Sequence, residues 1–276
     1  MWETTPASGT RPSSESDARR AQLVSEGEAA WAGRSDEPNV RMTIERWRVA
    51  LEIDPRDHVL WARLARSYYF LADGHLSFDD AREEEMMATF ELGIQAAEHA
   101  LMAISADFAE RVTAGTRVEE AAMVVEADAV PALYWRSTSM GKWALARGLD
   151  AVLAYKDEVR AIMTRCLELD ANYFHGGPHR YFGVFFARLP TFAGGNLEQS
   201  REHFVQALRA ENDYFGTHTL YAEYYAVGAR DRALFEEQLR WVTAANPNVL
   251  SDEAPENRVE QRRAQQLLAQ TGDLFE

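Results

Sequence analysis

Helix endings recur in this chain at a nearly constant spacing. Polar turns follow apolar helical stretches at residues 167–172, 208–213 and 244–247, and successive endings lie about 42 and then about 34 residues apart. An earlier helix ends at Asp54 and Pro55, because proline cannot continue the helical hydrogen-bond ladder. A period near 34 residues with two helices per unit is typical of tetratricopeptide-type repeats. The spacing therefore predicts stacked helical hairpins.

Helices are predicted almost throughout, because Ala, Leu, Glu and Arg recur at helical spacing and β-branched alternation is scarce. We expect hairpins at about 17–53, 57–104, 131–169, 178–210 and 216–245, followed by a cap helix at about 255–270. Residues 105–130 fit no repeat and are expected to form short helices packed across one face. The predicted fold class is all-α, with tetratricopeptide-like hairpins stacked in a right-handed solenoid.

The expected domain organisation is simple. A chain of 276 residues can bury a large core, and nothing in the sequence forces a division into independent domains. Residues 1–16 are rich in Ser, Thr, Pro and Gly and are predicted to form a disordered tail. Residues 17–276 are predicted to form one helical-repeat domain.

The charge balance excludes several partners. The formal net charge is −15, from 44 acidic against 29 basic side chains, and this surface repels nucleic acid and anionic lipid. No apolar run approaches the roughly 20 residues that a membrane-spanning helix needs. The first residues lack the basic start and apolar stretch of a signal peptide. As written, the sequence predicts a cytoplasmic protein, whereas a longer chain with a lipoprotein leader would be periplasmic.

Cys166 is the only cysteine in the sequence, so no intrachain disulfide can form. It lies in an apolar helical pattern and is expected to be a buried structural thiol.

Two pairs of adjacent glycines mark the candidate site. Gly176 and Gly177 precede Pro178, and Gly194 and Gly195 lie in a second short loop. Each pair is expected to lead directly into a helix. Pro178 suits the first turn of a helix, where its missing N–H would have no partner in any case.

The helix start at Pro178 has two interpretations. Its amides and positive helix end, with His175, His179 and Arg180 nearby, would attract a carboxylate or similar anion. Alternatively, the glycines only allow a tight turn with positive backbone dihedrals. His175 and His179 also raise the question of a metal site, but a zinc site needs further ligands that the sequence does not supply. We favour structural histidines and expect neither a metal nor a cofactor.

Aromatic side chains are dense on either side of these loops. Helical spacing of such residues usually indicates a core, whereas many phenol groups also suit the wall of an amphipathic cavity. Both interpretations stay open for the candidate ligand-contacting rings, which are Trp135, Tyr181, Phe192, Tyr221 and Tyr224.

Catalytic signatures are missing from the sequence. It contains no nucleophile elbow, no phosphate-binding loop and no dinucleotide-binding fingerprint in a strand–turn–helix context. The sequence predicts a protein that is not an enzyme.

Several segments resemble the T-component family of TRAP transporters. They are FHGGPHR at residues 174–180, FAGGNLE at 192–198, LYAEYYA at 220–226, ALYW at 132–135 and GKW at 141–143. The likeness covers about residues 20–250. It implies an all-helical tetratricopeptide-like fold, usually trimeric, with a cavity or pore in each protomer. It also implies a partner, the periplasmic solute-binding P-component of a tripartite ATP-independent transporter.

The preferred hypothesis is therefore a non-enzymatic binding protein that assists solute handover with a P-component. Arg180 and the helix start at Pro178 would position the polar end of a small organic anion or amphipathic ligand. The aromatic side chains would line its apolar part. The alternative hypothesis is a general tetratricopeptide-type scaffold that binds a peptide or helix in its concave groove.

Overall fold

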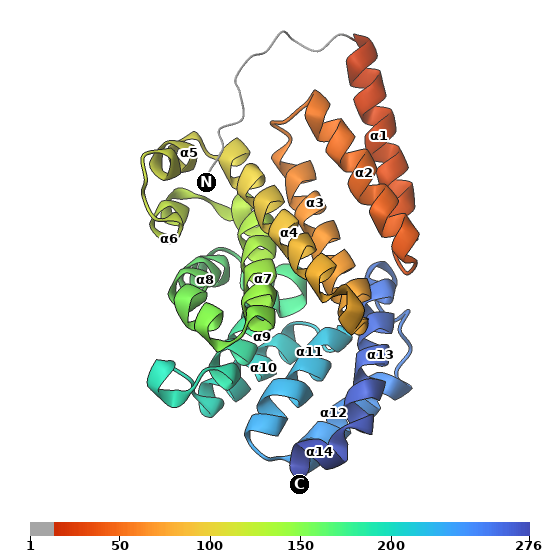
Figure 1. Cartoon of the computed structure of the whole chain (residues 1–276), viewed down its shortest axis with the longest axis vertical. Coiled ribbons are helices and arrows are strands. Elements are labelled where there is room, and N and C mark those ends of the chain that lie inside the picture. The colour runs from red at the N-terminus through yellow and green to blue at the C-terminus, as the bar shows by residue number, and fades with distance from the viewer. Residues whose placement is uncertain (1–13) are drawn as a thin grey trace. The chain divides into compact units, whose positions relative to one another are not determined.

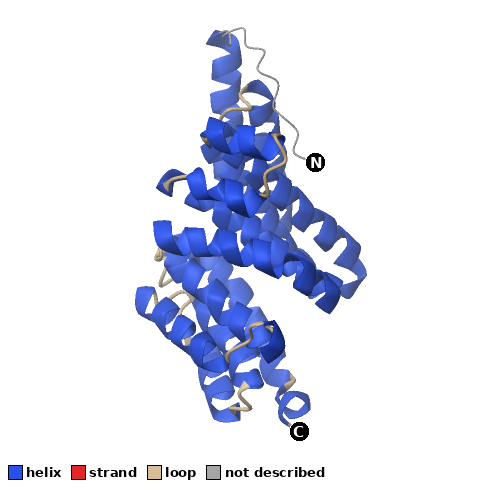
Figure 2. Cartoon of the chain, turned by 90° about the vertical axis from the view of Figure 1, so that its left-hand side faces the viewer, coloured by secondary structure: helices blue, strands red, loops and turns tan. Residues whose placement is uncertain are grey.

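The computed structural model describes residues 14–276, and every regular element in that range is helical (Figures 1 and 2). The all-α prediction is confirmed. The tail predicted at residues 1–16 lies mostly outside the described residues, and the first helix already begins at Ser14. None of the helices between residues 14 and 276 combines the length and apolar character that a membrane crossing requires.

The chain forms two compact units, one ending at Leu169 and the other running from Asp170 to Glu276. The long helices of the first unit are α1 (Ser14–Ala32), α2 (Glu37–Ile53), α3 (His58–Phe70), α4 (Glu83–Ile104), α7 (Val130–Arg147) and α8 (Leu149–Leu169). Helix α1 packs against α2, α3 against α4, and α7 against α8, as the expected hairpins require. The stacking of these hairpins in a right-handed solenoid, and the grouping of residues 17–276 in one domain, stay predictions.

Short helical turns fill the remaining segments of the first unit. A π-helical turn, η1 (Leu71–His75), and two 3-10 turns, η2 (Leu76–Phe78) and η3 (Asp80–Arg82), connect α3 to α4. The segment that fits no repeat holds α5 (Ala106–Thr113), α6 (Val118–Ala121), η4 (Ala122–Val124) and η5 (Ala127–Ala129). Phe108 and Val118 are buried there, and these short helices pack against α4 and α8.

Apolar stripes and one buried cation hold the first unit together. The apolar stripe of α2 is buried, and Trp47 in it packs so close to Gly27 that a Cβ on Gly27 would lie 2.2 Å from Trp47 Nε1. Arg136 is 3% exposed and donates to Glu98 Oε1 at 3.0 Å and to Glu158 Oε1 at 2.7 Å. A desolvated guanidinium is tolerated there because both carboxylates pair with it. It joins α4, α7 and α8.

The second unit carries the glycine-rich segments. Its elements are α9 (Tyr173–Arg188), η6 (Thr191–Ala193), α10 (Leu197–Ala210), α11 (Phe215–Leu220), η7 (Tyr221–Ala226), α12 (Arg232–Ala244), η8 (Ser251–Glu253), α13 (Ala254–Ala269) and α14 (Thr271–Phe275). Helix α9 packs against α10, and α12 packs against α13, which is the predicted cap helix. The turn η7 is a π-helix that continues α11.

A buried amide fixes α13 to the preceding turns. The Asn257 side chain is fully buried. Its Oδ1 accepts a hydrogen bond from Phe215 N at 3.0 Å, and its Nδ2 donates to Asp213 O at 3.1 Å. In the first unit, Cys166 is fully buried as expected, and burial raises the pKa of its thiol.

Two glutamates and two arginines connect the start of α2 to the start of α4. Arg82 donates to Glu37 at 2.8 and 2.6 Å, and Arg41 donates to Glu37 at 2.8 Å. Arg41 and Arg82 also donate to Glu85, at 2.5 and 3.0 Å. The hydrogen bonds from Arg82, and then those from Arg41, lower the pKa of Glu37 from 4.5 to about 2.

The Glu37→Gln substitution should therefore destabilise the protein near neutral pH, and this destabilisation should disappear in acid. Since the folded-state pKa lies below the ordinary 4.5, ionised Glu37 stabilises the fold above that pH, and its contribution is lost as the pH falls towards about 2. The difference in urea midpoint between wild type and variant should shrink over the same range. Glu45→Gln is the control, because Glu45 is 67% exposed on the same helix. A difference that stays constant from pH 6 to pH 2.5 would contradict the assignment.

Candidate functional site

A left-handed turn interrupts α9 at the first glycine pair. Phe174 has φ 45° and ψ 58°, His175 has φ 59° and ψ 49°, and Gly176 has φ 70° and ψ 27°. A non-glycine residue costs about 1–2 kcal/mol in this conformation, because its Cβ approaches the following carbonyl oxygen. The glycine segment is therefore a strained left-handed turn that leads into the helical part of α9, as expected for a turn before a helix. Such strain persists only where the surroundings enforce it.

Arg180 holds the left-handed turn in place through hydrogen bonds. Its guanidinium donates to Phe174 O at 3.1 Å, to His175 O at 3.0 Å and to Thr217 Oγ1 at 3.3 Å. The side chain is 5% exposed and lies 4.4 Å above the Tyr214 ring. The guanidinium therefore provides hydrogen-bond donors for the carbonyl oxygens of the two strained residues and joins α9 to α11. Binding of a ligand anion by Arg180 stays a prediction.

Aromatic contacts hold the same turn from outside α9. The His175 ring stacks on Tyr214 with centroids 5.1 Å apart and planes 11° apart, and Phe174 meets Tyr214 edge-on at 5.3 Å. His175 Nε2 lies 3.6 Å from Glu253 Oε1 in η8. His175 and His179 thus have different partners.

The glycines are needed for close packing. A Cβ on Gly176 would lie 3.0 Å from Ala207 Cα on α10, in addition to the cost of its positive φ. Gly177 and Pro178 are buried beside it. In the second pair, Gly194 has φ 102°, and a Cβ on Gly195 would lie 1.8 Å from Leu189 O. Gly176, Gly194 and Gly195 are therefore required by a positive φ or by close packing.

The predicted aromatic contacts divide into buried and exposed rings. Tyr221 is 5% exposed and packs on Phe204 with centroids 5.0 Å apart, and Trp135, in the first unit, is 3% exposed. These two rings are core residues. Tyr181 and Tyr224 are half-buried. Phe192 is 85% exposed on the turn η6, so it lies at the surface and not in a cavity wall.

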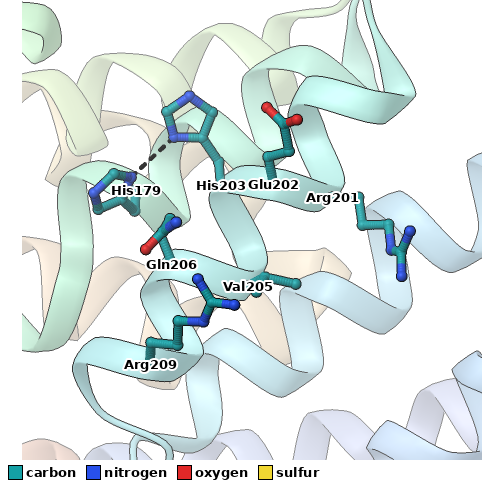
Figure 3. Close-up of a pocket in the computed structure, with 7 residues that line it drawn as sticks. All are labelled: His179, Arg201, Glu202, His203, Val205, Gln206 and Arg209. Atoms are coloured by element: carbon teal, nitrogen blue, oxygen red, sulfur yellow. Dashed lines mark hydrogen bonds between the residues drawn. The ribbon is translucent and has the colours of Figure 1, made fainter.

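A pocket of about 440 Å³ opens on the α9–α10 face. Figure 3 shows its lining side chains, which are His179, Arg201, Glu202, His203, Val205, Gln206 and Arg209. His179 comes from α9 and the other six come from α10. His179 Nδ1 lies 3.0 Å from His203 Nδ1, so one nitrogen donates and the other accepts.

Both histidines are held neutral by their surroundings. Burial lowers the pKa of His179. Burial, followed by repulsion from His179, lowers the pKa of His203 to about 4. The His203 ring also stacks on Phe186 with centroids 5.6 Å apart. His203 was not predictable from the sequence, because its pairing with His179 depends on the register between two helices and not on a local motif.

Arginines give the pocket a cationic side. Arg209 is exposed and, among the residues that the structure describes, has no hydrogen-bond or ion-pair partner. Arg201 hydrogen-bonds to the Tyr221 hydroxyl. In a chain of net charge −15, the lining of this pocket contains two arginines and one glutamate. No group of three His, Cys, Asp or Glu side chains converges within residues 14–276.

Arg180→Ala should destabilise the protein by about 3 kcal/mol, because it leaves two part-buried carbonyls without their donor and the left-handed turn without its cation. Arg180→Lys should recover only part of this loss, since one ammonium cannot reproduce the planar fork. Arg188→Ala, exposed at the end of the same helix, is the control and should stay within about 0.5 kcal/mol. Urea unfolding followed by circular dichroism measures all three. An Arg180→Ala variant as stable as the control would refute the structural role.

The comparisons with known proteins agree with the resemblance. The model of the TRAP transporter T-component family matches residues 49–275, from within α2 to the end of α14. A comparison with curated proteins found no match. The family is a component of transport systems and not a known family of enzymes. Because the match covers nearly the whole chain, this protein belongs to the TRAP transporter T-component family.

Proposed function

We propose that this protein is a non-enzymatic binding component that assists solute handover together with the solute-binding P-component of a TRAP transporter. The observation that carries the proposal is the family match over residues 49–275. The resemblance adds self-association as a homotrimer with a ligand cavity in each protomer. Three features of the second unit support a binding role. They are the left-handed turn in α9, the arginine-containing pocket on the α9–α10 face and the exposed turn η6.

The turn η6 provides a docking contact for the P-component. Phe192 is 85% exposed on it, and Leu197, at the start of α10, is 37% exposed. The backbone around them is fixed, since Gly195 packs on Leu189 O and Asn196 N donates to Phe186 O at 2.9 Å. A large aromatic on a rigid turn loses little conformational entropy when a partner covers it, which is the usual character of an interface anchor.

The α9–α10 pocket provides a place for a small organic anion. Its volume of about 440 Å³ lies in the range of small-molecule sites, which is roughly 300–1,000 Å³. Arg209 offers a charged donor, and the neutral histidines offer polar contacts beside apolar ring faces. The buried Arg180, by contrast, already serves the backbone carbonyls.

Light scattering of the protein with a TRAP P-component from the same organism tests the proposal. We expect a stable trimer that takes up the P-component. Phe192→Ser should weaken that association about tenfold or more, because an interface aromatic is worth about 2 kcal/mol. Val249→Ser is the matched control, since Val249 is also an exposed apolar residue of the second unit, at 46%.

Two outcomes would contradict the proposal. A monomer that ignores the P-component would remove the transport role and favour the scaffold that binds a peptide or helix. Equal loss of binding in the Phe192 and Val249 variants would remove η6 as the specific contact.

Arg209→Gln should weaken anion binding about tenfold or more, because a charge-assisted hydrogen bond contributes about 1.5–3 kcal/mol. Calorimetric titration with small mono- and dicarboxylates measures the effect. Arg188→Gln is the control, as an exposed arginine at the end of α9. Carboxylate affinities that are the same in both variants and in wild type would place the ligand elsewhere.

A further inference from the structure

The histidine pair in the α9–α10 pocket has a geometry that neither the family match nor the transport role explains. His179 and His203 come from different helices, and their Nδ1 atoms lie 3.0 Å apart (Figure 3). Their ring centroids are 5.2 Å apart and the ring planes make an angle of 42°. The two Nδ1 atoms therefore face each other from two packed helices.

We propose that the Nδ1 atoms of His179 and His203 bind one divalent late transition-metal ion. Neutral imidazole is a preferred ligand of Zn²⁺, Cu²⁺ and Ni²⁺. The mutual hydrogen bond would be replaced by two metal–nitrogen bonds, and the single proton that it uses would move to Nε2 of the same ring, so that both imidazoles stay neutral. This inference goes beyond the proposed transport function and does not depend on it.

The separation of the two nitrogens selects among these ions. With metal–nitrogen bonds of about 2.0–2.1 Å, nitrogens 3.0 Å apart subtend about 91–97° at the ion. That angle suits neighbouring positions in square-planar or octahedral coordination, which Cu²⁺ and Ni²⁺ adopt. A tetrahedral Zn²⁺ would need a separation of about 3.3–3.4 Å. We therefore expect affinity to follow the order Cu²⁺, Ni²⁺, Zn²⁺.

The surroundings leave room for the ion and its remaining ligands. The pair lines an open pocket, and the χ2 torsion of histidine is broad, so small ring rotations redirect both lone pairs at little cost. Gln206 lies one helical turn after His203, and Figure 3 shows its amide beside His179, where its oxygen is a possible third donor. Water fills the other positions.

Nearby charge and the absence of supporting contacts limit the affinity. Arg201 and Arg209 line the same pocket, although Figure 3 shows Arg201 directed away from the histidines, and Glu202 adds one carboxylate. Within residues 14–276, neither Nε2 has a protein partner that would orient its ring. The site is therefore expected to exchange its metal with solvent, unlike a closed structural site.

Titration of the full chain with Cu²⁺, followed by electron paramagnetic resonance and calorimetry, tests the proposal. We expect one ion per chain with two coordinated nitrogens. His179→Gln and His203→Gln should each weaken binding about 100-fold or more, because chelation is lost with either ligand. The double variant should lose less affinity than the sum of the two single losses, because the first substitution already removes the chelate. His58→Gln is the control, since His58 lies at the start of α3 in the first unit.

Thermal melting provides a second measurement for variants of altered stability. Cu²⁺ or Ni²⁺ in excess should raise the Tm of wild type and of the His58 variant, and should leave the Tm of both pocket variants unchanged. Binding that survives either pocket substitution, or losses that simply add in the double variant, would overturn the proposal. The Arg209→Gln variant should keep its metal, so failure of the anion site and failure of the metal site are distinguishable.

Discussion

The second unit depends on one buried guanidinium. Arg180 donates to the carbonyls of Phe174 and His175, and these are the two non-glycine residues in α9 with left-handed backbones. Without that guanidinium, both part-buried carbonyl oxygens would lose their hydrogen-bond donor. The ring of Tyr214 and the hydroxyl of Thr217 also contact the guanidinium, and these contacts connect the turn to the α11 region. One side chain thus joins the strained backbone to its neighbours.

The pocket is a consequence of that turn. Adjacent residues on a helix point in different directions, so a buried Arg180 directs His179 towards α10. There it meets His203, while Gly176 and Gly183 let α9 lie close against Ala207 and Phe204. The exposed turn η6 follows in the same hairpin. The candidate side chains of the pocket are therefore held by packed helices, which suits binding without large rearrangement.

Much of the architecture was predictable from local patterns. Apolar stripes, Pro55 and the recurring polar turns placed the paired helices, and the glycine pairs located the unusual backbone. The roles within that segment were not predictable in the same way. Whether Arg180 faces solvent or two carbonyls depends on Tyr214 and Thr217, which are distant in sequence. Phe192 and Tyr221 read alike in sequence, but tertiary packing exposes the first and buries the second.

Hydrogen–deuterium exchange of the protein, alone and with the P-component, tests the central claim most directly. The claim is that a rigid α9–α10 hairpin presents η6 to a transport partner. It predicts slow exchange at residues 174–183 in both states and new protection at residues 189–198 when the P-component binds. Rapid exchange at residues 174–183, or protection confined to other segments, would contradict it.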